Sequence, residues 1–233
     1  MKRRRLGQHY LVDAGVVHRM VGYARIRRDE RVLEIGTGKG VLTRELAVAG
    51  RSLEAYEIDR ENYESTRASL QGKAVDLHLG DVFKESPKFD VLVSSLPYSE
   101  SATFVEWLAM SRYSRAVVLL QEDFVKKILA PPGSRDYRGI SALAQITSEI
   151  DVMERVGREA FVPSPKVNSL VVRFLPRTRL GRQEILDVLM LFSLRRRKVS
   201  SALAELGMKA EGDFGNRRVY SLAPEEVYRI CGR

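Results

Sequence analysis

The sequence has only one cysteine, Cys231, among its 233 residues. An intramolecular disulfide and a cysteine-based metal cluster are therefore excluded, and a reducing, cytoplasmic setting is expected. No apolar run approaches the roughly 20 residues that a membrane-spanning helix needs. The start, MKRRRLGQHYLVD, is basic but lacks the apolar centre and the small-residue cleavage site of a secretory signal. Together these features predict a cytoplasmic protein that does not enter a membrane.

Acidic residues are outnumbered by basic ones. Lys and Arg total 39 against 30 Asp and Glu, which gives a net charge of +9 and an isoelectric point near 9.8. The excess is mostly arginine and gathers in two runs, Lys2 to Arg5 and Arg195 to Lys198. Arginine binds phosphate through two parallel hydrogen bonds and stacks on bases, so this excess of arginine indicates a nucleic-acid-binding protein. A solvated surface, or the ion-pair networks of a heat-adapted protein, is the alternative, and the content of only three asparagines fits it too.

Short apolar segments alternate with helical patterns in the first half of the chain. Predicted strands are 31–36, 52–59, 75–83, 88–95 and 115–121, and predicted helices between them are 41–50, 60–72 and 102–113. This alternation predicts an α/β fold with a parallel, doubly wound sheet. We take Trp107 as core of the last of these helices, and His18 and His78 as structural residues because neither has partners at metal-ligand spacing.

The second half of the chain changes from mixed to helical patterns. Helices are predicted over 122–129 and 140–150, and the segments 151–157 and 169–176 read as a pair of strands closing the sheet edge. After about residue 179 only helical patterns follow, over 182–207 and 223–232. We therefore predict a catalytic domain over 1–178 and a small α-helical RNA-binding domain over 179–233. The run Arg195 to Lys198 is expected on the terminal helices, where it would bind RNA phosphates and so contribute no base specificity.

A glycine-rich loop, EIGTGKG, follows the first predicted strand with Gly36, Gly38 and Gly40. Glycines at a strand-to-helix turn let a ligand touch the backbone and present amides at a helix N-terminus. Dinucleotide enzymes favour G-x-G-x-x-G, which seats a pyrophosphate. Here the third glycine comes one residue early, which suits an adenosyl group carrying an amino-acid tail, as in S-adenosyl-L-methionine. A nicotinamide dehydrogenase is therefore a distant alternative.

Two acidic residues extend this predicted cofactor site. Glu57 ends the second strand, 21 residues after Gly36, where it can accept hydrogen bonds from both ribose hydroxyls. Asp81 follows the third strand, where it can accept a hydrogen bond from the adenine amine. Because three such features fall at the ends of successive strands, we expect one nucleoside-cofactor pocket.

The fourth predicted strand ends in Ser95, Leu96, Pro97 and Tyr98. Pro97 fixes its own φ and holds the preceding residues extended. The exocyclic amine of adenine is a poor nucleophile, and the Ser95 hydroxyl and Leu96 carbonyl are two acceptors that could converge on its hydrogens. Tyr98 offers a flat face for an extruded base. A sulfonium methyl group is already activated, so positioning does most of the work and no metal is required. A plain strand–loop junction with a packing tyrosine is the other interpretation.

Four motifs together resemble the ribosomal RNA adenine dimethyltransferases that act on the small subunit (the KsgA and Dim type). GQHYLVD resembles the family's Q-N-F-L segment, EIGTGKG its cofactor loop and SLPYS its N-L-P-Y-x motif. FVPSPKVNSLVV, residues 161–172, resembles its F-x-P-x-P-x-V-x-S motif, the most specific of the four. The resemblance spans nearly the whole chain and implies a Rossmann-like S-adenosyl-L-methionine-dependent methyltransferase sheet with a small α-helical C-terminal domain.

The resemblance also implies an activity and a set of roles. The protein would dimethylate two neighbouring adenosines near the 3′ end of small-subunit ribosomal RNA, during ribosome biogenesis in a pre-ribosomal particle, and we expect it to act as a monomer. The implied cofactor-binding residues are His9, Leu11, Gly36, Gly38, Glu57, Asp81 and Ser95. Phe161 joins the four residues of the SLPY turn as a catalytic residue, covering the target base opposite Tyr98.

The sequence departs from the family at two positions, where His9 and Ser95 replace asparagine. A hydroxyl is shorter and less directional than an amide oxygen, so we expect activity that is slower or limited in the second methyl transfer. Two alternatives stay open: an adenine methylase of large-subunit RNA, like the erythromycin-resistance enzymes, and a non-catalytic RNA- or DNA-binding relative acting in assembly or transcription. Ser95 favours the non-catalytic relative. Glu57, Asp81, Tyr98 and Phe161 favour an enzyme.

Overall fold

The computed structural model describes residues 9–49, 52–70, 72–209, 212 and 214–232. The chain divides into two compact units. The first comprises the residues up to Ser101 together with 112–122 and 151–175, and the second comprises 102–111, 123–150 and the chain from Pro176 onward. The last junction lies near the boundary predicted at 178, but the second unit also takes in two earlier segments. The assignment of 1–178 to catalysis and 179–233 to RNA binding stays a prediction.

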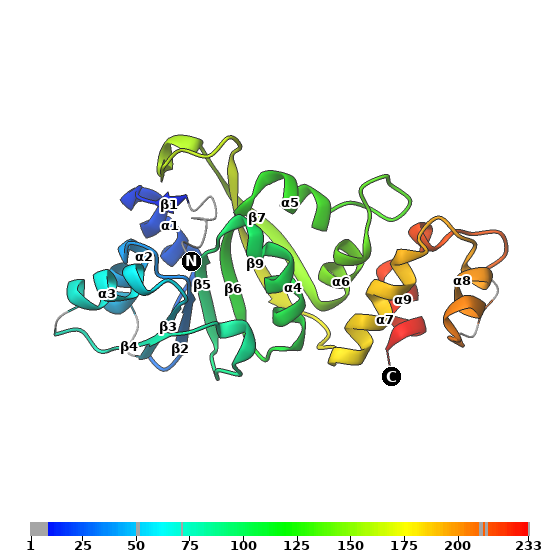
Figure 1. Cartoon of the computed structure of the whole chain (residues 1–233), viewed down its shortest axis with the longest axis horizontal. Helices are drawn as coiled ribbons and strands as arrows, with labels where there is room; N and C mark the ends of the chain where they lie inside the picture. Colours follow the sequence, from blue (N-terminus) through cyan, green and yellow to red (C-terminus); the bar gives the residue numbers. More distant parts are fainter. Residues whose placement is uncertain (1–8, 50–51, 71, 210–211, 213, 233) are drawn as a thin grey trace, which may run out of the picture. The chain divides into compact units, whose positions relative to one another are not determined.

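A seven-stranded sheet forms the framework of the first unit (Figure 1). Its strands, in spatial order, are β4 (Val75–Leu79), β3 (Ser52–Glu57), β2 (Arg31–Ile35), β5 (Val91–Ser95), β6 (Arg115–Gln121), β9 (Ser169–Pro176) and β7 (Ser148–Val156). The first five are parallel, and β9 runs antiparallel to β6. The predicted parallel strands are confirmed, and β7 and β9 close the edge as expected.

The strand order reverses between β2 and β5. From β2 the chain moves outward to β3 and β4 and then returns to β5 on the other side of β2. In open α/β sheets a ligand binds at such a switch point, outside the carboxyl ends of the strands. The apolar residues of β2 and β5 are buried, as expected for parallel strands inside a layered unit. The fold therefore places the glycine loop after β2 beside the SLPY turn after β5.

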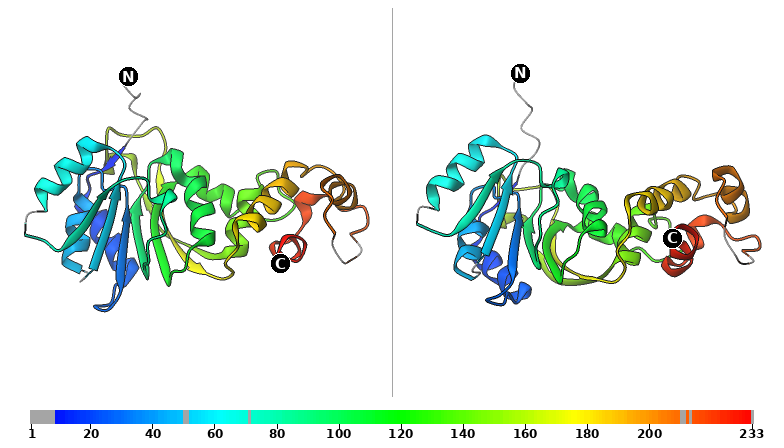
Figure 2. Two further views of the ribbon diagram at one scale, coloured as in Figure 1. Left: turned by 60° about the horizontal axis from the view of Figure 1, so that its bottom comes forward. Right: turned by 90° about the horizontal axis from the view of Figure 1, so that it is seen from below.

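Three helices pack on the parallel strands of this unit: α1 (Ala14–Ala24), α2 (Val41–Ala49) and α3 (Arg60–Ser69) (Figure 2). The side chain of Asp13 caps α1 by accepting from the Val16 amide, and Asp59 caps α3 by accepting from the Asn62 amide. Met20 and Leu46 on these helices belong to the buried core under the sheet. A short ribbon pairs β1 (Tyr10–Leu11) antiparallel with β8 (Phe161–Val162), which joins the first motif of the chain to the last.

The second unit is mainly helical. Its helices are α4 (Ser101–Met110), α5 (Glu122–Ile128), α6 (Gly139–Thr147), α7 (Arg182–Ser193), α8 (Val199–Leu206) and α9 (Pro224–Cys231). Helices α6, α7 and α9 pack against one another, and the Tyr137 and Phe192 rings meet edge to face at 5.4 Å. Trp107 is buried, as predicted. No helix in the described ranges is long and apolar enough to span a membrane.

Two predictions for these helices are wrong. The helix expected over 140–150 ends at Thr147, and the next residues begin β7, where Ile150 and Val152 alternate with charged residues at the period of a strand. The run from Arg195 lies in the turn between α7 and α8, not on a helix. The amide of Tyr220 binds the Arg195 carbonyl at 3.0 Å, a bond that holds this turn to a distant segment. The other basic run lies outside the described residues.

Candidate functional site

The glycine loop between β2 and α2 adopts a backbone that side chains disfavour. Gly36, Gly38 and Gly40 have φ values of +75°, +53° and +71°. A Cβ on Gly38 would lie 3.0 Å from the Tyr10 ring, and one on Gly40 would lie 3.1 Å from the Thr66 hydroxyl oxygen. Both strain and close contact therefore require glycine here. The loop forms a cradle at the carboxyl end of β2.

Glu57 lies at the end of β3, beside this loop. One of its carboxylate oxygens accepts the Gly38 amide at 2.9 Å, and the other accepts the Asp59 amide at 2.9 Å. Burial raises the pKa of Glu57, and the two amides partly oppose that shift. The Thr37 hydroxyl is a weaker third donor, 3.5 Å from the oxygen that binds Gly38. A carboxylate has about four acceptor positions, so two ribose hydroxyls would take the place of the Thr37 contact and the remaining position. Glu57 thus both fixes the loop and presents acceptor atoms.

Asp81 lies one strand further along. Strand β4 ends at Leu79, and Asp81 caps the following 3₁₀ turn (Val82–Lys84) by accepting the Phe83 amide at 3.2 Å. The Gly80 amide binds the Glu57 carbonyl at 2.9 Å. The two predicted acids therefore stand at neighbouring strand ends, as the sequence indicated.

The SLPY turn at the end of β5 meets the glycine loop. Pro97 Cδ lies 3.9 Å from the position a Cβ would take on Gly36, and the Ser94 hydroxyl donates to the Ile35 carbonyl at 2.6 Å. The hydroxyls of Tyr98 and Ser169 are hydrogen-bonded at 2.8 Å, and Ser169 is fully buried at the start of β9. Burial raises the pKa of Tyr98, so its phenol stays neutral near pH 7.

A small cavity brings the predicted catalytic residues together. Its volume is about 10 Å³, and it is lined by His9, Ser95, Leu96, Pro97, Tyr98 and Phe161. That space is about the size of one water molecule, so a base can enter only when lining side chains move. The His9 ring lies 5.7 Å from the Tyr98 ring, and its Nδ1 forms a 2.6 Å hydrogen bond with the Pro163 carbonyl.

The N-terminal motif divides between two places. His9 lies with the SLPY turn, and the Leu11 side chain is buried in the hydrophobic core, so a contact from Leu11 to a cofactor would come from its backbone. Their predicted cofactor roles stay predictions. Tyr10, which the sequence analysis did not select, covers the glycine loop: its hydroxyl accepts from Asn62 at 3.3 Å, and Lys39 lies over its ring at 4.9 Å. Side chains of neighbouring strand residues point to opposite faces, so the apolar Leu11 in a strand would have indicated that Tyr10 faces the other way, towards the loop.

Glu34 is a second residue that the sequence analysis left unassigned. It lies inside β2, is fully buried, and its two carboxyl oxygens have no hydrogen-bond partner in the described part of the chain. Burial raises its pKa to about 8, the nearby Thr43 hydroxyl opposes that shift in part, and the Glu57 charge adds to it. The sequence feature that could have indicated this residue is a single acid within the apolar run RVLEIG.

The raised pKa of Glu34 predicts a pH-dependent stability. Between its unfolded value of about 4.5 and its folded value of about 8, the folded chain holds a proton that the unfolded chain has lost. The free energy of unfolding therefore falls as pH rises through this window. We expect Glu34→Gln to flatten this fall in urea titrations at pH 5 to 8, while Glu64→Gln on an exposed part of α3 leaves it unchanged. An unchanged slope in Glu34→Gln would show that Glu34 is ionised in the folded protein.

Comparisons with known proteins show to which family the chain belongs. The family model described as ribosomal RNA adenine dimethylase matches residues 1–224. A relative from Pyrococcus abyssi, named "Probable ribosomal RNA small subunit methyltransferase A", is 35% identical over 97% of this chain and 89% of its own. One of the same name from Methanothermobacter thermautotrophicus is 32% identical over 98% of this chain and 89% of its own. The chain belongs to the ribosomal RNA adenine dimethylase family.

Solved structures show the same architecture. A dimethyladenosine transferase from Plasmodium falciparum matches with a TM-score of 0.81 at 22% identity, over 95% of this chain and 96% of its own. The 23S rRNA methyltransferase ErmE matches with a TM-score of 0.69 at 26% identity, over 95% of this chain and 97% of its own. The Rossmann-like α/β fold and the family resemblance are thus confirmed, and the enzyme is an S-adenosyl-L-methionine-dependent RNA adenine dimethylase.

The residues of this dimethylase fit that cofactor. The glycine cradle lets a ligand approach the backbone, where a Cβ on Gly38 would press against Tyr10. Glu57 and Asp81 place carboxylate oxygens at adjacent strand ends, and acceptors of this kind suit ribose hydroxyls and an adenine amine. We assign the cofactor to this edge of the sheet as a proposal, since its contacts follow from donor chemistry.

The hydrogen bond between Tyr98 and Ser169 predicts a positioning role for Ser169 in the dimethylase. Ser169→Ala removes about 1 kcal/mol of support for the tyrosine, so we expect methylation to slow about fivefold while cofactor affinity is unchanged. Ser164→Ala is the matched control because its hydroxyl, in the same motif, is exposed and donates to the Arg158 carbonyl, away from Tyr98. Single-turnover methylation and cofactor calorimetry separate the two quantities. Equal methylation rates in both variants would contradict the role.

Proposed function

We propose that the enzyme dimethylates the exocyclic amines of two adjacent adenosines near the 3′ end of small-subunit ribosomal RNA. One observation carries the proposal: the SLPY turn lies against the glycine loop, through the approach of Pro97 to Gly36. This contact sets base-facing groups beside the expected methyl donor. The curated relatives named for the small subunit cover nearly the whole chain, which supports that substrate.

The cofactor site is proposed to orient the donor. S-adenosyl-L-methionine supplies a sulfonium-activated methyl group when bound. Glu57 accepts hydrogen bonds from the ribose hydroxyls, and Asp81 accepts one from the adenine amine. The Gly36 and Gly38 backbone lies close to the ligand because neither residue carries a side chain. With these contacts made, the donor is held without side-chain rearrangement in the loop.

The SLPY turn is proposed to hold the target adenine. The Ser95 hydroxyl and the Leu96 carbonyl accept the two hydrogens of the exocyclic amine, which fixes the direction of its nitrogen. Pro97 keeps these acceptors in place, so they do not reorganise during the reaction. Tyr98 stacks on one face of the extruded base, and Phe161 covers the other. The base enters as the side chains around the small cavity move apart.

A large-subunit substrate is the second candidate. The solved structure of a 23S rRNA methyltransferase, at 26% identity, favours it because the shared fold extends over 95% of this chain. The small-subunit relatives have higher identity, between 30% and 36%, over at least 96% of the chain. The small subunit is therefore the better supported substrate. A non-catalytic role is disfavoured because a pure RNA binder needs neither acid of the cofactor site.

Mass spectrometry of adenosines tests the proposal directly. Purified enzyme is incubated with S-adenosyl-L-methionine and immature small subunits, with large subunits as the control. We expect dimethyladenosine at two neighbouring positions of small-subunit RNA only. Monomethyl products at early times would measure how far Ser95 slows the second transfer. Unmodified small subunits, or modified large subunits, would overturn the proposal.

The cellular setting follows from the proposed substrate. We propose that the enzyme acts as a monomer on a pre-ribosomal particle in the cytoplasm. The single cysteine supports a reducing compartment, since Cys231 is buried and free. Size-exclusion chromatography of the enzyme with and without particles tests the stoichiometry.

A further inference from the structure

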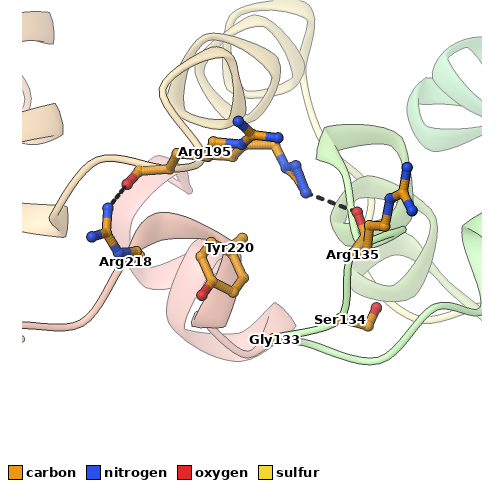
Figure 3. Close-up of a pocket in the computed structure, with 7 residues that line it drawn as sticks. Gly133, Ser134, Arg135, Arg195, Arg218 and Tyr220 are labelled. Atoms are coloured by element: carbon orange, nitrogen blue, oxygen red, sulfur yellow. Dashed lines mark hydrogen bonds between the residues drawn. The ribbon is translucent and has the colours of Figure 1, made fainter.

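Two cavities of the structure differ in the proton chemistry of their lining. The cavity of about 420 Å³ in the second unit is lined mainly by arginines, which donate hydrogen bonds and accept no proton. There Arg195 donates to the Arg135 carbonyl at 2.8 Å, and Arg218 donates to the Arg196 carbonyl (Figure 3). The small cavity of the first unit contains an imidazole, that of His9. An imidazole takes up and releases protons near neutral pH, so the methyl-transfer site itself holds a base.

The pairing of β1 with β8 holds the His9 ring in this cavity. In the antiparallel register Tyr10 lies opposite Val162. The flanking residues, His9 and Pro163, therefore come opposite each other, and the Nδ1 atom of the histidine lies 2.6 Å from the proline carbonyl oxygen. The histidine ring also lies beside that of Tyr98, with the centroids 5.7 Å apart and the planes tilted by 34°. His9 thus lies next to the aromatic ring on which the target base is proposed to stack.

The bond to Pro163 determines which nitrogen of the neutral His9 ring carries the hydrogen. A carbonyl oxygen only accepts hydrogen bonds, so Nδ1 must donate. Since a neutral imidazole has a single N–H group, Nε2 then keeps its free lone pair. The two nitrogens lie on opposite sides of the five-membered ring. The basic nitrogen is therefore on the side of the ring that is turned away from Pro163.

The other described residues of this cavity do not offer a base. The Ser95 hydroxyl and the Leu96 carbonyl accept hydrogen bonds, but both are too weakly basic to hold a proton at neutral pH. The Tyr98 phenol is neutral because burial raises its pKa, and its oxygen is hydrogen-bonded to the Ser169 hydroxyl. The two remaining residues are a proline and a phenylalanine. Of the described residues that line this cavity, only His9 can take up a proton.

Methylation of an amine releases a proton. In each transfer the exocyclic nitrogen bonds to the methyl carbon, and the electron pair of the broken carbon–sulfur bond stays on sulfur. The nitrogen becomes neutral again when one N–H bond breaks, with the electron pair returning to nitrogen and the proton moving to a base. A base that takes the proton while the new bond forms lowers the barrier, because less positive charge builds up on nitrogen. A dimethylated adenosine requires this step twice.

We propose that Nε2 of His9 accepts the proton that the exocyclic amine of the target adenine loses in each methyl transfer. The proposal rests on the proposed function for the identity of that target. With the amine held by Ser95 and Leu96, the imidazole supplies a proton acceptor that an asparagine at this position does not provide. The histidine is partly exposed, so the imidazolium returns the proton to solvent between transfers. This role is additional to the cofactor contact predicted for His9 from the sequence.

Nitrogen-15 NMR of the full-length enzyme, without RNA or cofactor, tests the state of the ring. At mildly alkaline pH we expect His9 to have a protonated Nδ1 and a bare Nε2. The loss of its signals in His9→Gln identifies them among those of the other two histidines, His18 and His78. A neutral ring protonated at Nε2 would refute the proposal, because that nitrogen would have no lone pair to offer.

Single-turnover methylation of immature small subunits, at saturating cofactor, tests the proton transfer. A positioned general base contributes roughly 10²- to 10⁴-fold, so we expect His9→Gln to slow methylation by about 100-fold. His18→Gln is the matched control, because that imidazole is exposed on α1 and pairs with Glu45 at 3.0 Å, outside the cavity. The control should methylate at the wild-type rate. A His9→Gln enzyme as fast as the control would show that the proton goes to water instead.

Chemical rescue separates proton transfer from the structural effect of losing the Pro163 bond. In His9→Ala, added imidazole should raise the methylation rate by about tenfold or more, since it restores a base to the cavity. The ring of 1,2,4-triazole has the same shape but is a much weaker base, so it should not restore the rate. Equal rescue by the two rings, or rescue by neither, would contradict the role of His9 as a proton acceptor.

Failure of the proposed function has a different signature. It is seen in the wild type, as small subunits that stay unmethylated under the same conditions. Failure of the role of His9 is seen only in the variants, when the wild type methylates its target and His9→Gln does so at the same rate.

Discussion

Replacing Tyr98 with alanine is expected to slow adenosine methylation by roughly 10- to 100-fold while cofactor affinity stays unchanged. Stacking of a base on an aromatic ring contributes about 1–3 kcal/mol, and the alanine variant loses that contact with the extruded adenine. The ring is already fixed before a base arrives, because its hydroxyl binds Ser169 at 2.8 Å. Single-turnover rates at saturating cofactor measure the loss at the transfer step.

Tyr98→Phe is the matched control for this experiment. It keeps the ring but removes the hydroxyl, so it should slow methylation only about fivefold, as Ser169→Ala does. Because both variants break the same hydrogen bond, their double variant should lose no more than either one alone. A Tyr98→Ala enzyme as active as Tyr98→Phe would show that the ring does not stack on the target base.

The second large effect is expected at Glu57. Glu57→Ala should weaken S-adenosyl-L-methionine binding by at least about 100-fold, since each hydrogen bond to a charged group contributes roughly 1.5–3 kcal/mol and two ribose hydroxyls lose their acceptor. The variant also frees the Gly38 and Asp59 amides, which the carboxylate accepts at 2.9 Å. Loosening of the loop adds to the loss. Calorimetric titration with the cofactor measures it.

Glu64→Ala is the control for that titration, because it removes an exposed acid from α3, the helix that follows Glu57. Its cofactor affinity should match the wild type. RNA binding should be intact in both variants, because neither acid belongs to the SLPY turn that is proposed to hold the target adenine. Normal cofactor affinity in Glu57→Ala would remove the acid from the binding site and leave it a purely structural role at the end of β3.

Most of the first unit follows from local patterns. The strands β2 and β5 are short apolar runs, and β3 alternates apolar with polar residues. All three end at glycine, acid or proline signals, and their alternation with helices along the chain predicts the parallel arrangement. The same logic places Glu57 and Asp81 at one edge of the sheet, because carboxyl ends of parallel strands meet there. These features depend mostly on residues close together in the sequence, so local sequence patterns predict them.

The contacts that sequence could not reveal are long-range. Tyr98 and Ser169 are 71 residues apart, and their bond depends on the antiparallel register that pairs Gln121 with Ser169. No local pattern encodes that register. The Arg195 turn was predicted on a helix because the whole stretch 182–207 has a helical pattern. Tertiary bonds from a distant segment hold that turn instead, for example from the Val219 amide to the Arg197 carbonyl.

A crystal structure with S-adenosylhomocysteine and an adenosine-bearing RNA fragment tests the central claim most directly. The account predicts that the ribose contacts Glu57, that the cofactor adenine lies at Asp81, and that the target adenine lies between Tyr98 and Phe161. The exocyclic amine of the target adenine should donate to the Ser95 hydroxyl, with its nitrogen facing the cofactor sulfur. A cofactor and a target base held in separate hollows, with no path between sulfur and nitrogen, would contradict the account.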